Sequence, residues 1–412
     1  MLEWVRTNMG IIVQKFGGSS VADAERIRRV ALRAIETQKQ GNDVVVVVSA
    51  MGDTTDELIT LMNELSSSPS DREVDMLLST GEQVSIALLA MTIEELGYSA
   101  ISLTGPQAGI MTEDVHLKAK IIEVKPDRVL EELKKGKIVV VAGFQGINSN
   151  GDITTLGRGG SDTTAVALAA ALNSEVCEIF TDVDGVYTAN PRLVPDAKKL
   201  SVISYDEMLE MASLGAQVLQ SRAVEFAKHY GVKIHVRASF NNSEGTIVRE
   251  ERNMEKGTVV TGVTYDKNVA KFAILGVPDT PGIAHKIFSA LGDARINVDV
   301  IVQGAKSNEV TDILFTVAQT DIKKSRTILE KICLEIGATG ILCEEDVAKV
   351  SIVGAGMASN PGVAGRMFGA LAKVGVNIEA VSTSEIKISC LIKQDSTEKA
   401  VKAIHEEFGL GK

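Results

Sequence analysis

The first half of the chain alternates short, β-branched apolar runs with longer segments of helical periodicity. Positions 44–48 are all valine, as expected of a strand that is buried on both faces of a parallel sheet. Between the first two runs, apolar residues recur at i, i+3, i+4, i+7 and i+8 from Ile27 to Ile35, which predicts a helix with one buried face. The predicted strands are Ile11–Gln14, Val44–Ser49, Ala100–Leu103, Ile138–Phe144, Val176–Phe180 and Val232–Ala238.

Strands that alternate with helices predict an α/β fold, a mostly parallel sheet sandwiched by helices. In such folds ligands bind at the carboxyl ends of the strands. Polar residues that directly follow a predicted strand are therefore the first candidates for a functional site.

The second half of the chain contains an internal repeat. The segment from Pro281 to Asn297 recurs without a gap 80 residues later, from Pro361 to Asn377. In each copy a strand precedes a Pro-Gly turn and a helix, and a further strand is expected to begin at the asparagine. The pattern predicts two duplicated βαβ-type domains, since two copies are too few for a solenoid. The predicted first strands of the copies are Ala270–Leu275 and Lys349–Val353.

These patterns divide the chain into five parts. The patterned sequence begins at Met9, and the polar stretch Asn241–Gly257 separates the two halves. The predicted boundaries are 1–8 for an N-terminal extension, 9–245 for the α/β domain, 246–268 for a linker region, and 269–343 and 344–412 for the two repeated domains.

Composition narrows the class of protein. Hydrophobic residues make up 45% of the chain and charged residues 24%, which excludes a disordered, collagen-like or disulfide-scaffold protein. The net charge of −11 argues against binding along nucleic acid or an anionic membrane. The 4 cysteines show no CxxC pair and the 5 histidines no ligand spacing, so no metal site is predicted. The start has no apolar signal core and no apolar stretch reaches a spanning length, so a cytoplasmic protein is expected.

Two glycine-rich motifs offer anion receptors. Lys15-Phe-Gly-Gly-Ser-Ser20 directly follows the first strand, where bare backbone and a lysine suit phosphate. It matches neither common nucleotide fingerprint, and a tight turn with a surface lysine is the alternative. Gly157-Arg-Gly-Gly-Ser-Asp162 opens an apolar helix, and an arginine with bare backbone at a helix N-terminus receives anions well. There the alternative is a plain N-cap by Ser161 or Asp162.

Three further features carry candidate chemistry. The loop 180–192 offers acidic groups for Mg²⁺, an aromatic ring for a base and an arginine for phosphate, and it is equally a turn-rich loop. The segment Ser49–Thr55 adds hydroxyl and backbone donors, and Glu82 by itself reads as a solvated surface carboxylate. Anion receptors without an evident general base suit phosphoryl transfer to an acceptor that is already ionised.

Four motifs in this order resemble the aspartate kinases of the amino acid kinase superfamily, and the resemblance runs from Met9 to the C-terminus. The repeats are similar to paired ACT domains, α+β (βαββαβ-like) modules that bind amino-acid effectors. The short, stand-alone bacterial type is the most similar, because no homoserine dehydrogenase domain follows. The motifs are Lys15–Ser20, Val48–Gly52, Gly157–Asp162 and Thr181–Tyr187.

The resemblance implies transfer of the γ-phosphoryl group of ATP to the β-carboxylate of L-aspartate. The product would be 4-phospho-L-aspartate, at the head of lysine, threonine, methionine and isoleucine biosynthesis. ATP would be a co-substrate, Mg²⁺ would be carried by the nucleotide, and no metal-ligating residue is assigned. Lys15 and Asp162 would be catalytic. The implied substrate contacts are Thr55, Glu82, Arg158 and Ser161. The implied ATP contacts are Lys15, Gly17, Gly18, Ser19, Ser49, Thr181, Asp182, Tyr187 and Arg192.

Two positions depart from the family pattern. Asn190 stands where many relatives have aspartate, which removes an acidic group from that loop. Gln217 stands where many relatives have a lysine near the nucleotide, so hydrogen bonding is kept and the charge is lost. We expect the affinity for ATP to differ accordingly.

The regulatory prediction depends on the repeats. A Pro-Gly turn that leads into a helix N-terminus can receive an effector carboxylate, and an acidic neighbour can receive the amine. The alternative is a structural dimerisation module. The resemblance implies lysine and/or threonine as effector, a homo-oligomer formed through the ACT domains, and room for a shorter regulatory subunit started internally near Met254. The implied effector contacts are Asp279, Pro281, Gly282, Ile283, Ala284, Asn297, Asp299, Gln303, Val363, Ala364, Asn377, Ile378, Ser384 and Glu385.

The residues leave two other functions open. One is a kinase of the same fold for another carboxylate amino acid. The other is an amino-acid-sensing regulatory protein with an inactive kinase domain, against which the presence of Lys15, Arg158, Ser161 and Asp162 argues. Neither alternative involves nucleic acid or a membrane.

Overall fold

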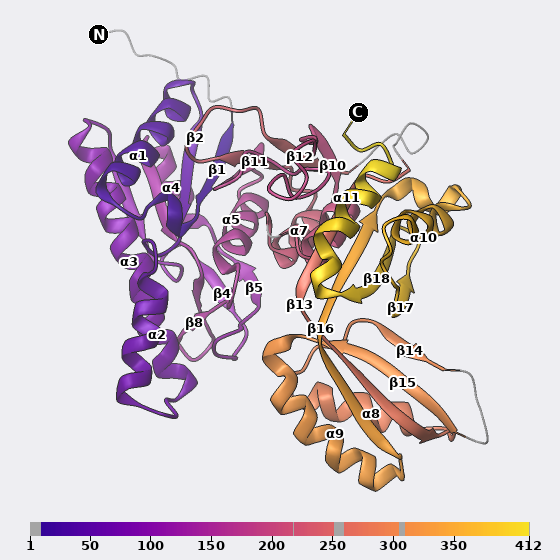
Figure 1. Cartoon of the computed structure of the whole chain (residues 1–412). Helices are drawn as coiled ribbons and strands as arrows, with labels where there is room; N and C mark the ends of the chain where they lie inside the picture. The colour runs from indigo at the N-terminus through magenta and orange to yellow at the C-terminus, as the bar shows by residue number, and fades with distance from the viewer. Residues whose placement is uncertain (1–9, 217, 251–258, 305–309, 412) are drawn as a thin grey trace, which may run out of the picture. The chain divides into compact units, whose positions relative to one another are not determined.

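The computed structural model describes residues 10–216, 218–250, 259–304 and 310–411. The chain divides into two compact units (Figure 1). The first unit comprises Met1–Val186, Lys199–Ala212 and Gln217–Arg252. The second comprises Tyr187–Lys198, Ser213–Ala216 and Asn253–Lys412.

Within the described part of the first unit, eight strands form one sheet in the order β10-β12-β11-β9-β1-β2-β6-β3. Neighbours run parallel except for the antiparallel pair β11 and β12 among the described strands. The predicted α/β fold with a mostly parallel sheet is therefore confirmed. The strands are β1 (Ile11–Phe16), β2 (Asp43–Val48), β3 (Ala100–Leu103), β6 (Ile138–Ala142), β9 (Val176–Thr181), β10 (Val202–Ser204), β11 (Ile234–Ala238) and β12 (Thr246–Arg249).

The six strands predicted for this half correspond to β1, β2, β3, β6, β9 and β11. The strand expected to reach Phe144 ends at Ala142, because Phe144 has a φ of 69° and turns the chain away from the sheet. The pattern misses β10 and β12, which have only three and four residues and too little sequence for a period to show.

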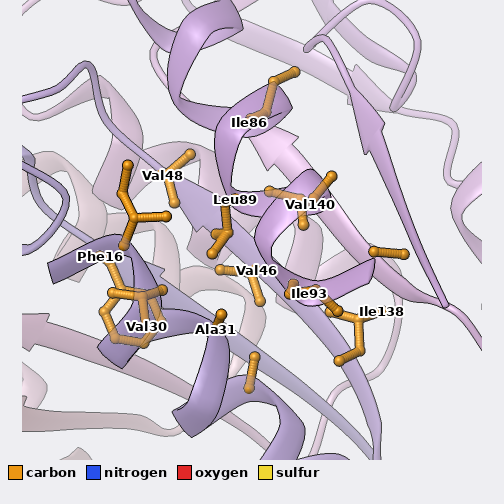
Figure 2. Packing of buried hydrophobic residues seen from close by; sticks show 14 of the residues in the cluster. Phe16, Val30, Ala31, Val46, Val48, Ile86, Leu89, Ile93, Ile138 and Val140 are labelled. Carbon is orange, nitrogen blue, oxygen red and sulfur yellow. The ribbon is translucent and has the colours of Figure 1, made fainter. Parts of the chain in front are cut away.

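Helices α1 (Ala24–Lys39) and α3 (Asp71–Glu95) pack over β1, β2 and β6 (Figure 2). The α1 helix begins where the Asp23 side chain accepts a hydrogen bond of 2.8 Å from the Arg26 N–H. Its apolar face is the predicted one and lies against Leu89 of α3 and the valines of β2. Burial of one such aliphatic side chain contributes about 2 kcal/mol. The other helices of this unit are α2 (Thr54–Leu65), α4 (Asp127–Lys134), α5 (Gly160–Ala171), α6 (Tyr205–Ser213) and α7 (Ser221–Tyr230).

Helix α5 contacts β1, β2 and β9. Residues alternate between the faces of a strand, so Val45 and Val47 point away from α1 and α3 and are nevertheless completely buried. The sheet is covered on both faces, and this explains the unbroken valine run of β2.

Helix α3 has, among the described residues, the length and composition that could cross a membrane. Half of its apolar window is buried, however, and its buried face carries Asp75 and Glu82. A core helix that packs on a sheet passes the same test of length and composition, and α3 packs on β6 and β3.

A second, small sheet belongs to the same unit. Its four described strands lie in the order β5-β4-β7-β8, with β4 and β7 parallel and the outer pairs antiparallel. The sequence pattern does not predict it, because three or four residues carry no readable period. The strands are β4 (Ile110–Thr112), β5 (Ile121–Val124), β7 (Gln145–Ile147) and β8 (Ile153–Thr155).

The second unit is built on an antiparallel sheet whose six described strands follow the order β14-β15-β13-β16-β18-β17. Its two long central strands each serve both repeats. The strands are β13 (Gly262–Pro278), β14 (Ile301–Gln303), β15 (Val310–Val317), β16 (Gly340–Val353), β17 (Ala380–Thr383) and β18 (Lys387–Lys393). The helices are α8 (Ile283–Asp293), α9 (Ile322–Ile336), α10 (Val363–Lys373) and α11 (Thr397–Glu407). Short 3-10 turns occupy Gln319–Asp321, Ala355–Ser359 and Gln394–Ser396 in this unit and Gly18–Ser20 in the first unit.

Each repeat forms a βαββαβ module with its own core. The first core lies between α8, α9 and the later part of β13, around Phe272 and Phe315. The second lies between α10, α11 and the later part of β16, and it takes in Val263 from the beginning of β13. Residues 262–266 pair with 349–353, so the second module borrows its last strand from a segment that precedes the first module.

The predicted linker region 246–268 contributes β12 to the large sheet of the first unit and the beginning of β13 to the sheet of the second unit. The strands expected to begin at Asn297 and Asn377 begin later, at Ile301 and Ala380. The residues before them already bond to the neighbouring strand, since the Asp299 N–H donates to the Thr316 carbonyl at 3.1 Å.

Candidate active site

Lys15 and Asp162 meet at the carboxyl edge of the large sheet. The Lys15 Nζ lies 2.6 Å from the Asp162 Oδ1, and the two side chains are only 12% and 9% exposed. Lys15 is the fifth residue of β1, and Asp162 lies in the first turn of α5. The two residues assigned to catalysis thus form one largely buried ion pair beside a helix N-terminus, where free N–H groups favour negative charge.

The glycine-rich turn after β1 packs on the loop after β2. The Gly52 N–H donates to the Gly18 carbonyl at 3.1 Å, and a Cβ on Gly18 would lie 2.7 Å from the Ala50 carbonyl oxygen. A side chain at Gly18 would therefore push the two loops apart. A Cβ on Gly17 would lie 3.4 Å from the Lys15 Nζ, so this glycine keeps the space above the lysine clear.

Ser49 and Ser161 join the end of β2 to the start of α5. The Ser49 hydroxyl donates to the Ser161 hydroxyl at 3.0 Å. The approach depends on Gly143, where a Cβ would lie 2.6 Å from the Ser161 Oγ. Helix α5 begins at Gly160 after Gly159, so neither Ser161 nor Asp162 is the N-cap and that alternative is wrong.

Glu82 is buried in α3 at 3% exposure, and the interpretation as a solvated surface group is wrong. Its Oε1 accepts a hydrogen bond of 3.1 Å from the Ala50 N–H, and its Oε2 has no partner among the described residues. Burial raises the pKa of Glu82 to about 7, although that hydrogen bond lowers it. Glu82 therefore adjoins the same loop as Gly18. Thr55, in the first turn of α2, follows this loop and is half-buried.

The loop that carries Arg158 is held from behind by residues that the sequence does not single out. Arg222 donates to the carbonyls of Leu156 at 2.9 Å and of Ala119 at 2.8 Å. A Cβ on Gly159, whose φ is +72°, would lie 2.0 Å from the Cγ of Gln220. Arg158 itself is exposed. No local motif marks Arg222, because its partners are backbone carbonyls distant in sequence.

Part of the predicted nucleotide set lines one cavity. Ser19 and Asp182 border a space of about 320 Å³ together with Arg26 and Arg29 of α1. The Thr181 hydroxyl donates to the Asp182 carboxylate at 3.0 Å. The two arginines were not predicted, since on the sequence they read as the solvated face of α1.

Tyr187 and Arg192, also predicted as ATP contacts, belong to the second unit. Asn190 has a structural role in the same segment: its Oδ1 accepts from the Arg192 N–H at 2.9 Å, and its Nδ2 donates to the Tyr265 hydroxyl at 3.2 Å. Gln217 lies outside the described residues.

The predicted effector residues gather in the two modules of the second unit. Gly282 and Gly362, with φ of 95° and 92°, precede the first turns of α8 and α10. Asp299 forms an ion pair with Lys349, and in the corresponding position Glu379 lies 2.5 Å from Lys271. These ion pairs cross between the repeats. The remaining predicted contacts are Asp279, Pro281, Ile283 and Ala284 at the start of α8, Asn297 and Gln303 near β14, Val363 and Ala364 in α10, and Asn377, Ile378, Ser384 and Glu385 around β17.

Comparison with known proteins fixes the family. Residues 10–238 match the amino acid kinase family, and residues 273–332 and 350–408 match the ACT domain. The chain is 54% identical over 409 residues to the aspartokinase of Mycolicibacterium smegmatis, covering 98% of this chain and 97% of that protein. The chain belongs to the aspartokinase family. It is therefore an enzyme, an aspartate kinase with an amino acid kinase domain and two ACT domains, and as a kinase it uses ATP.

Other aspartokinases agree in sequence and in structure. The aspartokinase of Bacillus sp. (strain MGA3) is 54% identical over 402 residues, with 98% of each chain covered. The crystal structure of E. coli aspartokinase III in complex with aspartate and ADP (R-state) has a TM-score of 0.81 and 25% identity, over 96% of this chain and 99% of that one. Aspartate kinase from Clostridium acetobutylicum has a TM-score of 0.77 and 26% identity, over 96% of this chain and 100% of that one.

Proposed function

We propose that the chain transfers the γ-phosphoryl group of ATP to the β-carboxylate of L-aspartate, giving 4-phospho-L-aspartate and ADP. The observation that carries this proposal is the ion pair of Lys15 and Asp162 at the N-terminus of α5. The complex of E. coli aspartokinase III with aspartate and ADP supports the choice of substrates. The same reasoning proposes a role at the head of lysine, threonine, methionine and isoleucine biosynthesis, in the cytoplasm.

The proposed chemistry needs positioning and charge compensation more than proton transfer. The β-carboxylate of aspartate has a pKa near ~4 and is ionised at pH 7, so it attacks without a general base. Lys15 would stabilise the charge on the transferring phosphoryl group, with free N–H groups at the start of α5. Asp162 would hold the Lys15 ammonium in place and orient the substrate. Arg158 and Glu82 would bind the α-carboxylate and α-ammonium of aspartate.

The metal ion in this proposal is the Mg²⁺ that ATP carries. Among the described residues no three histidine, cysteine or acidic side chains gather in a group that could hold a metal. Mg²⁺ commonly binds through substrate phosphates with one or two carboxylates and waters, and Asp182 at the nucleotide cavity fits that donor type. When bound, the ion would neutralise phosphate charge.

We further propose that the two ACT modules make the enzyme sensitive to lysine and/or threonine, and that they join copies of the chain. Two crystal structures support control by an effector: E. coli aspartokinase III with lysine and aspartate is in a T-state, and with aspartate and ADP in an R-state. Coupling requires that the effector bind the two states with different affinity. The proposed limits of the catalytic and ACT domains are 9–245, 269–343 and 344–412, with 1–8 and 246–268 outside them. A shorter chain begun near Met254 would carry both modules.

One assay tests the function and its alternatives. ADP formation is measured with ATP, Mg²⁺ and L-aspartate, with L-glutamate and N-acetyl-L-glutamate as matched acceptors, and with lysine, threonine or both added. We expect turnover with aspartate alone of the three acceptors, and suppression by at least one effector condition. Turnover with another acceptor only would support the alternative carboxylate kinase. ATP binding without turnover would support the sensor with an inactive kinase domain.

Glu82 gives the proposed site a pH dependence. Its carboxyl pKa is about 7 in the folded chain and about 4.5 when unperturbed, so between these values the folded state binds more protons than the unfolded state. The free energy of unfolding therefore falls by about 3 kcal/mol from this group as the pH rises from 4.5 to 7. Glu82→Gln keeps the acceptor for Ala50 and is expected to remove that fall, which urea unfolding at pH 5 and pH 8 measures.

The same variant tests the substrate contact. The ionised carboxylate binds the substrate ammonium, so KM for L-aspartate is expected to fall in the unsubstituted enzyme as the pH rises through about 7. In Glu82→Gln we expect a higher KM that does not change with pH. Glu95→Gln, at an exposed position of the same helix, is the matched control. An unchanged KM profile in Glu82→Gln would refute the substrate contact.

A further inference from the structure

A second polar cavity lies on the α1 face of the large sheet. It has a volume of about 560 Å³ and is bordered by β1, β9 and β11 together with α1. Its polar lining includes Gln14, Glu178 and Arg237 from the strands and Arg33 and Thr37 from the helix. Gln14 and Lys15 are successive residues of β1 and so point to opposite faces of the sheet. The cavity is therefore separate from the side of the sheet on which Lys15 meets Asp162.

The floor of the cavity is an organised hydrogen-bond network. The Gln14 Nε2 donates to the Glu178 Oε2 at 2.8 Å and to the Thr37 Oγ1 at 2.9 Å. The Arg237 Nη1 donates to the Glu178 Oε1 at 2.8 Å. Gln14 is 1% exposed and Glu178 8%, so these side chains are fixed within the protein rather than on a solvated surface.

Two atoms of this network have unused bonding capacity. The Gln14 Oε1, an acceptor, and the Arg237 Nε, a donor, are buried and have no hydrogen-bond partner among the described residues. A buried polar atom without a partner has lost its hydrogen bonds to water and gained none in the protein. A ligand that bonds to either atom therefore gains binding free energy. A ligand that satisfies both atoms carries an N–H or O–H donor for the Gln14 Oε1 and an acceptor for the Arg237 Nε.

The charges of the cavity point to the same chemistry. Arg33 donates to the Asn241 carbonyl at 2.8 Å and to the Asn242 Oδ1 at 3.1 Å, which are neutral acceptors. The guanidinium groups of Arg33 and Arg237 lie 4.7 and 5.7 Å from the centre of the Phe180 ring. Burial first, and then the nearby Arg237, lower the pKa of Arg33, while Glu178 raises it. Two guanidinium groups, Arg33 and Arg237, and two carboxylates, the buried Glu178 and the exposed Glu36, thus border the cavity, so a ligand meets both signs of charge.

We propose that this cavity is a binding site for an α-amino acid in its zwitterionic form. The ligand carboxylate would lie between Arg33 and the Arg237 Nε, since guanidinium groups bind carboxylates through paired hydrogen bonds. The ligand ammonium would donate to the Gln14 Oε1 and to Glu178. A purely anionic ligand would leave the Gln14 Oε1 unsatisfied, and a purely cationic one would face two guanidinium groups. The site is additional to the aspartate site and to the ACT modules, and it does not depend on the proposed function.

Saturation-transfer NMR of the full-length protein tests the proposal with a mixture of the twenty proteinogenic amino acids as the probe. We expect at least one amino acid to bind saturably and to lose affinity at least tenfold in Arg33→Met. The Arg33 side chain bonds only to neutral acceptors among its described partners, so its removal leaves none of them as an unpaired charge. Arg28→Met, an exposed position of the same helix, is the matched control and should leave that affinity unchanged. Amino acids bound elsewhere in the protein keep their signals in both variants.

A second variant keeps the test decisive if Arg33→Met is unstable. Asn42→Trp places an indole ring at a half-buried position that borders the cavity and removes no charged group, so it should abolish the same signal. L-lactate, L-malate and inorganic phosphate are titrated in parallel. Amino-acid signals that are equal in Arg33→Met and Arg28→Met would overturn the proposal. Binding sensitive to Arg33→Met for lactate, malate or phosphate alone would overturn the assignment to a zwitterion.

Discussion

Replacing Lys15 by methionine is expected to lower kcat for ADP formation by about 10³-fold, the scale on which loss of one preorganised charge at a transition state is felt. Methionine has nearly the length of lysine and fills the same space, so the loss reports the ammonium group. Because the Lys15 Nζ lies 2.6 Å from the Asp162 Oδ1, the substitution also leaves a buried carboxylate unpaired. Breaking a buried ion pair costs roughly 3 kcal/mol or more, and the Tm of Lys15→Met should fall.

The double variant Lys15→Met with Asp162→Asn separates catalysis from stability. Removing both charges should restore most of the Tm while kcat stays low. Lys39→Met, at the exposed end of α1, is the control and should leave kcat unchanged. Steady-state kinetics with L-aspartate and calorimetry measure the two effects. A kcat of Lys15→Met within threefold of the unsubstituted enzyme would refute the catalytic role of this ion pair.

Replacing Gly159 by alanine is expected to lower kcat/KM strongly. Gly159 has a φ of +72°, a conformation that costs an L-residue about 1–2 kcal/mol, and its Cβ would lie 2.0 Å from the Gln220 Cγ. The start of α5 must therefore move, and Ser161 and Asp162 move with it. Because misplacing reacting groups by about 1 Å can cost 10²-fold, kcat/KM should fall by about that factor.

Gly151→Ala is the matched control for Gly159→Ala. Gly151 has a φ of +85°, but a Cβ there would meet nothing within 4 Å. The control shares the backbone strain without the overlap, and it should lose about 1 kcal/mol of stability with unchanged kcat/KM. Urea unfolding and initial-rate kinetics are measured for both variants. Equal kinetics in the two variants would show that the position of the α5 start does not limit turnover.

The sequence predicts some parts of the site because they are local. The motif Lys15–Ser20 lies directly after an apolar strand, and Gly157–Asp162 directly before an apolar helix, so both are expected at the carboxyl edge of a parallel sheet. The structure brings Lys15 and Asp162 to ion-pair distance there. The roles of the individual residues stay predictions, to be tested by the variants above.

Other parts of the site depend on contacts that no local pattern records. Glu82 reads as a surface group, because a single carboxylate in a helix gives no sign of which face is buried. The Arg222 side chain donates to two backbone carbonyls. Every residue has a backbone carbonyl, so these contacts require no particular residue type at the partner positions. Gln14 gives no signal either, since its importance comes from its neighbours Glu178 and Thr37.

The repeats show the same division. Their 80-residue offset on the sequence predicts two modules, and both modules are present. The sequence pattern does not predict that the modules share strands. Residues 262–266 pair with the second module, although the first module lies between them in the sequence. Pairing between strands does not depend on their order along the chain. It depends on backbone geometry and on apolar side chains that lie on the same face of the sheet.

The sequence by itself determined most of the helices and strands and the fold class. Apolar periodicity, glycine-rich turns and the internal repeat can all be recognised from the order of residues along the chain. The tertiary structure alone decided which distant charges meet and which polar groups are buried. The ion pairs of Lys15 with Asp162 and of Lys349 with Asp299 are of this kind. The physical reason is the range of the forces. Backbone conformation responds to the nearest few residues, whereas burial and charge pairing depend on whatever the folded chain brings within a few ångströms.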